Sequence, residues 1–179
     1  MRRILSLVSI LACLVLLGGN QPVQGQTASH TVHLPLVSNA QASNRVGLIV
    51  DFGGERRITT CVSFTEPELR EVEVLRRSGL EIACKAYPGI GEAVCRIEDV
   101  GCTYPAEPCW CQCTGSPCVF WSLWYWEESQ EGWVYQGMGA SSRGMHDGEI
   151  IAFMWGSGDN APPALPFDVL CTPPVQATM

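Results

Sequence analysis

Cysteine spacing is the feature of this sequence that most constrains how the chain can fold. Nine of the ten cysteines lie after residue 60, and seven of those nine fall between residues 84 and 118. This density is typical of a small domain that is held together by disulfides. The odd count leaves at least one cysteine outside intrachain pairs, and four bridges among eight cysteines allow about 105 connectivities, so no pairing is predicted. The candidates are Cys61, Cys84, Cys95, Cys102, Cys109, Cys111, Cys113, Cys118 and Cys171.

The first 25 residues have the pattern of a cleaved signal peptide. Two arginines precede an apolar run at residues 4–17, which is shorter than the roughly 20 residues that span a bilayer. Val23-Gln24-Gly25 offers the small-residue spacing that signal peptidase favours, so we expect residues 1–25 to be removed. A lipid-modified Cys13 is the alternative, but the apolar run continues beyond it. With no second run long enough to span, the pattern indicates a secreted or cell-surface protein.

The charge of the chain argues against nucleic acid as a partner. The formal net charge is −7, and removing Arg2 and Arg3 with the signal peptide leaves −9. Phosphate backbones are bound by clustered lysine and arginine side chains, whereas Lys85 is the single lysine here and the arginines are scattered. We therefore expect a small soluble ligand or an extracellular protein as the partner.

One small domain is predicted between two irregular ends. Residues 26–44 are mostly small and polar, and we expect a flexible leader there. Residues 159–179 are rich in proline, which cannot continue a regular element, and Cys171 is expected to fasten this tail to the domain. Residues 45–158 then form the domain, whose modest core profits from cross-links.

The first half of the domain predicts two strands followed by a helix. Apolar residues alternate between residues 46 and 64 on either side of Gly53-Gly54, which is typical of a β-hairpin. Thr65 and Glu68 have the spacing of a capping box, so a helix is expected to begin there and to end at Gly79.

The second half predicts an insert and three strands. Residues 84–118 lack periodicity, apart from a short strand at 93–97, and combine cysteine with glycine and proline, as a disulfide-held loop does. Strands are expected at residues 120–126, 133–135 and 149–155. The order is therefore ββα, a disulfide-rich insert and βββ, which defines a small α+β domain.

The strand at residues 120–126 is unusual because both of its alternating faces are apolar. Trp121, Leu123 and Tyr125 point to one side, whereas Phe120, Trp124 and Trp126 point to the other. One face must belong to the core, and the second is core as well if the insert folds over it. Alternatively, one face is a platform on which a flat or apolar ligand stacks. The candidate ligand-binding residues are Trp110, Trp121, Trp124, Tyr125, Trp126 and Trp133.

Neither catalysis nor a resident cofactor is expected from the remaining polar residues. The three histidines, His30, His33 and His146, lie in the leader or in a predicted turn, so no base is near a serine or cysteine nucleophile. No glycine loop precedes a helix in the way that phosphate binding requires. Disulfides are the expected state of Cys109-Trp110-Cys111-Gln112-Cys113, which lacks the paired C-x-x-C arms of zinc sites; a zinc or copper site is the alternative.

Several local strings resemble a known family. The helix region at 69–80, the aromatic strand, Gly139-Ala140 and the run at 146–155 are similar to the DUF4430 or transcobalamin-like C-terminal domain. That family combines an amphipathic helix, an aromatic strand, a Gly-Ala step and a D-G-D-x-I-x-W ending, in which Glu149 here replaces the second aspartate. The resemblance covers residues 45–156 and implies a β-grasp fold that binds a soluble ligand, with a corrinoid as one candidate. The cysteine-rich insert is not a general feature of that family.

Three functional hypotheses follow from these patterns. The leading one is an exported, non-catalytic module that binds a soluble ligand or an extracellular partner through the aromatic strand and the loop at residues 102–118. The second is a structural or adhesive cell-surface module in which all the aromatic side chains are packed. The third is a metal-binding protein that uses the cysteine loop.

Overall fold

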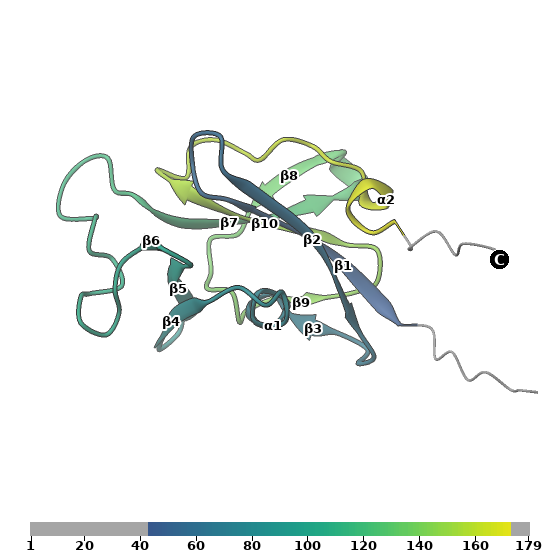
Figure 1. Ribbon diagram of the computed structural model, residues 1–179, viewed down its shortest axis with the longest axis horizontal. Helices are drawn as coiled ribbons and strands as arrows, with labels where there is room; N and C mark the ends of the chain where they lie inside the picture. The colour runs from purple at the N-terminus through teal and green to yellow at the C-terminus, as the bar shows by residue number, and fades with distance from the viewer. Residues whose placement is uncertain (1–42, 173–179) are drawn as a thin grey trace, which may run out of the picture. The chain divides into compact units, whose positions relative to one another are not determined.

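The computed structural model describes residues 43–172, which belong to the second of two compact units of the chain, Asn39–Met179. The expected signal peptide, Cys13, His30, His33 and almost all of the leader lie outside the described residues, as do residues 173–179 of the tail. The described part is mostly β-sheet with few helices (Figure 1). None of the helices in this part is long and apolar enough to cross a membrane.

A five-stranded sheet forms the centre of the domain. Its strands are β1 (Asn44–Asp51), β2 (Arg57–Phe64), β7 (Phe120–Glu127), β8 (Gly132–Tyr135) and β10 (Ile150–Gly156). Their spatial order is β2-β1-β10-β7-β8. The central pair, β1 and β10, is parallel, and the other neighbouring pairs are antiparallel. The predicted hairpin and the three predicted strands of the second half are thus confirmed to within two residues at each end.

The central strands β1 and β10 are buried on both faces of this sheet, because their alternating side chains are apolar on either side. One face packs against helix α1 (Glu71–Arg77) and holds the main core, to which β1 contributes Val46, Leu48 and Val50. The opposite face carries a smaller cluster built on Ile49, Trp124, Ile150 and Ala152. The aromatic strand β7 therefore contributes to two separate cores.

The C-terminal segment covers this second face. Leu165, Phe167 and Leu170 pack against the smaller cluster, and the last two belong to the short helix α2 (Phe167–Leu170). A disulfide between Cys61 on β2 and Cys171 fastens the segment, as the sequence predicted for Cys171. The tail rather than the cysteine-rich insert thus makes the second face a core, and the folded domain extends beyond residue 158.

The predicted start of the helix is wrong. Residues Leu69–Arg70 form strand β3, which pairs with β9 (Gly144–Met145), and α1 begins only after them. The N-cap residue is Arg70 rather than Thr65. Pairing with a distant strand has overridden the local helix signal, which is a weak prior. The predicted stop is confirmed, because α1 ends two residues before Gly79, whose φ is 84°.

Part of the cysteine-rich insert is regular structure, contrary to the prediction. Strands β4 (Ile82–Tyr87), β5 (Gly91–Ile97) and β6 (Val100–Gly101) form a three-stranded antiparallel sheet. Only the strand near residues 93–97 was expected, because the alanine and lysine residues of β4 have weak strand propensity and Pro88-Gly89 breaks the pattern. Residues 102–119 contain no strand or helix.

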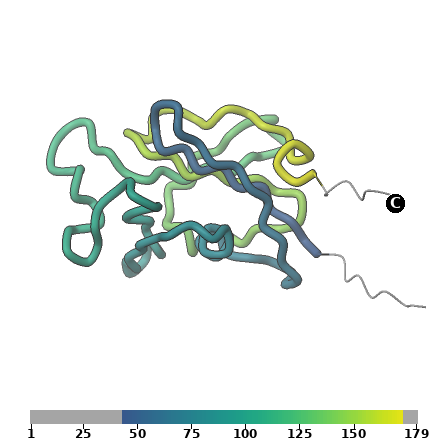
Figure 2. Tube along the Cα trace, viewed as in Figure 1, coloured from purple at the N-terminus to yellow at the C-terminus, as the bar shows by residue number. Residues whose placement is uncertain are grey.

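Eight of the nine candidate cysteines are paired. Besides Cys61–Cys171, the bridges are Cys95–Cys109, Cys102–Cys111 and Cys113–Cys118. Cys84, on β4, is the one cysteine without a disulfide partner among the described residues. Three of the bridges hold the stretch between β5 and β7, where the trace loops out from the sheets and returns (Figure 2).

Candidate ligand-binding pocket

A pocket opens between the small sheet and the main sheet, beside the first half of β7. Its walls come from β5 and the turn before it, from the disulfide-held loop, from β7 and from the segment that follows β8. Its cavity volume is about 80 Å³, well below the roughly 300–1,000 Å³ of sites that enclose a drug-sized ligand, so it has room only for a small group of a larger ligand. We call it the Trp110 pocket, and its lining includes Trp110, Phe120, Trp121, Leu123, Tyr135 and Met138.

The rim of the Trp110 pocket gathers exposed apolar side chains. Ile90, Trp110 and Met138 all line it and are between 38% and 46% exposed. Within residues 43–172, Tyr135 and Val169 are the only other large apolar side chains that are exposed. Single exposed apolar residues are ordinary, whereas a group of them around one hollow is characteristic of binding sites. The rim is therefore the strongest sign of function in the described domain.

Two disulfides position Trp110. Its neighbours in the chain are Cys109, which is bonded to Cys95 on β5, and Cys111, which is bonded to Cys102. Both anchor cysteines are buried: Cys95 lies in β5, the central strand of the small sheet, and Cys102 follows β6 directly. Because the residue between two anchored neighbours has little freedom, a loop without regular structure presents Trp110 in a fixed place.

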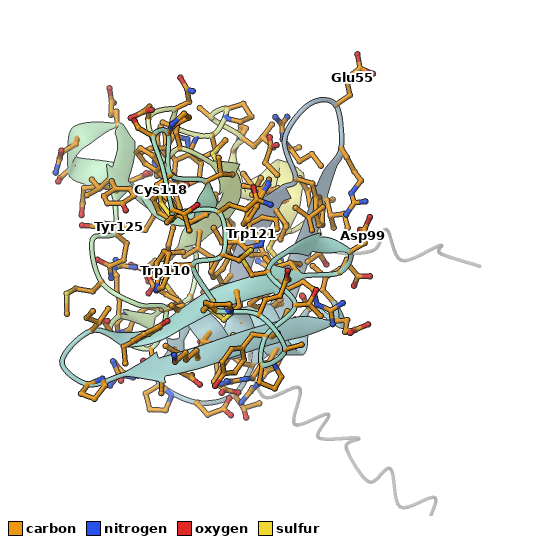
Figure 3. All side chains as sticks on the ribbon, turned by 90° about the vertical axis from the view of Figure 1, so that its left-hand side faces the viewer. Glu55, Asp99, Trp110, Cys118, Trp121 and Tyr125 are labelled. Carbon is orange, nitrogen blue, oxygen red and sulfur yellow. A yellow bond between two sulfur atoms is a disulfide. The ribbon has the colours of Figure 1, made fainter. Side chains whose placement is uncertain are left out.

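Aromatic side chains surround Trp110. Its ring centroid lies 5.7 Å from that of Phe120, at the start of β7, and 6.3 Å from that of Tyr87 on β4. Figure 3 looks onto this end of the domain, where Trp110 and Trp121 lie between the small sheet and Cys118. These rings form an apolar surface against which a flat group can stack.

Residues 136–140 form the opposite wall and are held by backbone hydrogen bonds. The Gln136 N–H donates to the Leu123 carbonyl at 2.8 Å, which extends the pairing between β7 and β8. The Gly139 and Ala140 N–H groups donate to carbonyls of Ile90 and Glu92 at 2.8 and 2.7 Å. Glycine is needed for this close approach, because a Cβ atom on Gly139 would lie 2.7 Å from the Glu92 carbonyl oxygen. The wall is thus joined to both sheets.

The polar groups that line the pocket are largely engaged by the protein itself. Glu92 is the one charged lining residue, and its carboxylate accepts a hydrogen bond from Arg76 at 2.8 Å. The Ser122 hydroxyl donates to the Met154 carbonyl and accepts from the Trp124 indole N–H, each at 3.1 Å. A buried ligand charge would find no free partner here, so the pocket fits an uncharged apolar group.

A buried carboxyl group lies behind the wall. Glu71, the first residue of α1, is 0% exposed, and neither of its carboxylate oxygens has a hydrogen-bond partner in the described structure. Burial raises the pKa of Glu71 to about 7. The nearby Gln136 side chain and the charge of Arg143 act against this rise without cancelling it.

The structure separates the aromatic residues that the sequence proposed as ligand contacts. Trp110 and Trp121 line the same pocket, although Trp121 is itself buried and donates its indole N–H to the Val100 carbonyl at 3.2 Å. Tyr125 faces the main core, where the guanidinium of Arg143 lies 4.2 Å from its ring centroid.

The other three proposed residues lie on the opposite face of the main sheet. Trp124, Trp126 and Trp133 all belong to the cluster beneath the C-terminal segment. The rings of Trp126 and Trp133 meet edge to face with centroids 5.6 Å apart. The six candidates therefore do not form one site.

Two rim residues escaped the sequence analysis. Ile90 comes from the turn between β4 and β5, and Met138 lies in the loop that follows β8. No local pattern marks them, because their meeting depends on how the two sheets are placed against each other.

Residues 43–172 contain no group of three or more side chains that could hold a metal ion, and Cys84 carries their one free thiol. The cysteines of the run 109–113 are all in disulfides, which leaves no thiolate there for a metal. Burial raises the pKa of the Cys84 thiol to about 11, so its reactive thiolate form is scarce.

Comparison with known proteins adds no assignment. No family model matches this chain, and no curated protein matches it. The function proposed below therefore depends on the geometry of the Trp110 pocket.

Proposed function

We propose that this protein is an exported, non-catalytic binding module whose Trp110 pocket holds a flat, apolar and uncharged group of a soluble ligand. The observation that carries the proposal is the group of three exposed apolar side chains, Ile90, Trp110 and Met138, that line one hollow. A ligand that covers such side chains removes apolar surface from water, and this stabilises the complex by about 25 cal/mol per Å² of apolar surface buried.

The chemistry of the lining sets the ligand class. Trp110 and Phe120 supply ring faces and edges on which a planar group can stack. Glu92 is neutralised by Arg76, so neither an anion nor a cation gains a free partner in the pocket. A planar hydrocarbon or heteroaromatic group therefore matches this surface better than a charged one.

The fold supports the wider assignment. A helix on one face of a mixed sheet, with a parallel central pair in the order β2-β1-β10-β7-β8, agrees with the β-grasp arrangement of the transcobalamin-like family that the sequence resembles. Four disulfides agree with export into an oxidising compartment. A corrinoid remains one candidate ligand, and its macrocycle is large enough that it would lie across the rim rather than enter the pocket.

The test is binding of N-phenyl-1-naphthylamine, a neutral planar fluorophore, to the purified mature protein. We expect a saturable rise in probe fluorescence, and we expect Trp110→Ala and Met138→Ala each to raise the dissociation constant about tenfold, as loss of a large apolar contact does. Val169→Ala is the matched control, because Val169 is exposed but lies on α2, outside the pocket lining. Displacement of the probe by cobalamin, cobinamide or haem would identify a tetrapyrrole-like ligand.

Two results would overturn the proposal. One is the absence of saturable binding, and the other is binding that all three variants leave unchanged.

The competing candidate is a structural or adhesive module, and the burial of Trp121 and Trp124 favours it for those two residues. It predicts that pocket variants lower the free energy of unfolding without any effect on probe binding. For Trp124→Ala we expect such a loss of stability, about 3–5 kcal/mol, because its ring is packed on the second face of the sheet.

A further inference from the structure

The Glu71 carboxyl group occupies an environment that suits only its neutral form. Its side chain is fully buried and both oxygens lack hydrogen-bond partners. A carboxylate in such a place pays a large desolvation cost unless it gains a partner or water, whereas a carboxylic acid pays much less. We therefore expect ionisation of Glu71 to be accompanied by a structural change.

No cation near Glu71 is free to neutralise it. The charged groups that act on it are Arg143 and Glu149. The Arg143 guanidinium donates to Glu149 at 2.8 Å and also lies over the Tyr125 ring, so it is already engaged. Glu149 is an acid and opposes ionisation. The donors nearest the carboxyl group are the Gln136 side chain and the Arg143 backbone, and both act to lower its pKa. Since neither makes a full hydrogen bond to Glu71, a full hydrogen bond to the carboxylate requires residues 136–143 to shift.

That same segment is a wall of the Trp110 pocket. The Val72 N–H donates to the Ala140 carbonyl at 2.8 Å, and the Glu71 N–H donates to the Arg143 carbonyl at 3.3 Å. Gln136 lines the pocket and its side chain lies near the Glu71 carboxyl group. The start of α1 and the pocket wall are thus one hydrogen-bonded unit.

We propose that protonation of Glu71 holds this wall in place. While Glu71 is neutral, the Trp110 pocket keeps the shape that binds its ligand, and when Glu71 ionises the wall loosens. The proposal depends on the proposed function only for the consequence for ligand binding, since movement of the wall is a property of the free protein.

The folded state favours the neutral form of Glu71, and this sets the pH range in which the wall is tight. Because the pKa of buried Glu71 is raised to about 7, the tight wall is expected below neutral pH and is lost as the pH rises through that value. For release of one proton, the dissociation constant of a ligand that needs the neutral form can rise at most tenfold per pH unit.

The first experiment measures amide hydrogen exchange of the free wild-type protein at several pH values near neutrality. Protection factors, which divide out the intrinsic effect of pH, are followed for Val72 and Ala140 and compared with those of Leu48 in the central strand. We expect protection at Val72 and Ala140 to fall severalfold as the pH rises through neutrality, while Leu48 stays protected. Equal behaviour of all three amides would overturn the proposal.

The variant Glu71→Gln retains the shape of the neutral acid and removes its titration. We expect its Val72 and Ala140 protection to be independent of pH, and its affinity for N-phenyl-1-naphthylamine to keep the low-pH value throughout. Glu73→Gln is the matched control, because Glu73 lies on the same helix in an exposed ion pair with Arg76.

A direct titration needs no variant. The ¹³C chemical shift of the Glu71 carboxyl carbon should titrate near neutrality in the wild-type protein, and a midpoint at the ordinary value for glutamate would refute the switch. Absence of probe binding together with pH-dependent protection would refute only the proposed function. Probe binding with pH-independent affinity would refute only the switch.

Discussion

Gly101 shows, at the scale of single residues, how closely the small sheet approaches the aromatic core. Its φ is 120°, a conformation that side chains strongly disfavour, and a Cβ atom there would collide with the Cys95 carbonyl and lie 3.0 Å from the Trp121 indole nitrogen. No other residue fits this place without displacing the β5 backbone or Trp121.

We expect Gly101→Ala to lower the free energy of unfolding by roughly 2–5 kcal/mol, because backbone strain and overpacking add. Gly115→Ala is the control, since nothing lies within 4 Å of a Cβ atom at Gly115 and its φ is not positive. Urea unfolding with intact disulfides measures both changes. Equal stability of the two variants would show that the close approach at Gly101 does not affect the free energy of unfolding.

Burial of Glu71 should also make the stability of the folded protein depend on pH. The folded-state pKa of about 7 lies above the ordinary 4.5, so the stabilisation from the neutral acid is fully present below about pH 4.5 and is lost as the pH rises through about 7. The pKa difference corresponds to about 3 kcal/mol.

The measurement is the free energy of unfolding of wild-type and Glu71→Gln proteins from pH 4.5 to pH 8.5. We expect the difference between them to grow by about 3 kcal/mol in favour of the variant over this range. A difference that is constant with pH would mean that Glu71 titrates alike in the folded and unfolded states.

Some of these residues could be found from the sequence and others could not. Trp110 and Trp121 were candidates because aromatic residues beside cysteines or in a doubly apolar strand are unusual in themselves. Ile90 and Met138 are ordinary residues in turn and loop segments, and their exposure around one pocket is a property of the packed chain. The burial of Glu71 was equally invisible, because an acidic residue in the first turn of a helix is common.

At the scale of elements, period-two alternation predicted the strands of the main sheet well. In β2, for example, Ile58, Val62 and Phe64 face the core and alternate with the exposed Arg57, Thr59 and Ser63. The predicted helix start, in contrast, is wrong. Leu69 fits the apolar face of a helix and also pairs with Met145 in β3 and β9, and the sequence contains no information on which partner is near.

The small sheet illustrates a second limit at this scale. In β4, Cys84, Lys85 and Ala86 carry no clear alternation, and the strand exists because it pairs along its whole length with β5. Short strands of this kind owe their stability to neighbours rather than to their own composition. The Cys95–Cys109 bridge then fastens the following loop to β5, and the bridges Cys102–Cys111 and Cys113–Cys118 close that loop internally.

At the scale of the whole molecule, the order of elements was predictable, whereas their placement was not. A ββα unit followed by three strands is compatible with several sheet orders, and the pairing of β1 with β10 joins residues about a hundred positions apart. The C-terminal segment is the clearest case. Its prolines excluded a strand, but its role as cover of the second face depends on one long-range bridge.

We therefore expect the Cys61–Cys171 bridge to contribute more to stability than the short-range bridges do. It closes a separation of 110 residues, against 5 for Cys113–Cys118. In the chain-entropy model, removing these bridges costs about 5 and about 2 kcal/mol respectively. We expect the double variant Cys61→Ser/Cys171→Ser to be much less stable than Cys113→Ser/Cys118→Ser in urea unfolding, and to expose the smaller apolar cluster as well.

Equal losses in the two double variants would indicate that the C-terminal segment stays docked by packing alone. Fluorescence of Trp124 and its neighbours on the second face separates these outcomes, because their rings lie beneath that segment.

The first and last described residues lie near the same end of the main sheet, where β1 begins. The Arg45 guanidinium, at the start of β1, donates to the Cys171 carbonyl at 2.7 Å. The first half of β7, which lines the Trp110 pocket, lies toward the other end, because β7 runs antiparallel to β10 and β10 runs parallel to β1 (Figure 1). A sensor chip, a bead or a fused reporter joined directly at Ser43 or Thr172, the ends of the described domain, would thus leave the mouth of the pocket facing away from the attachment, which suits ligand screening with immobilised protein.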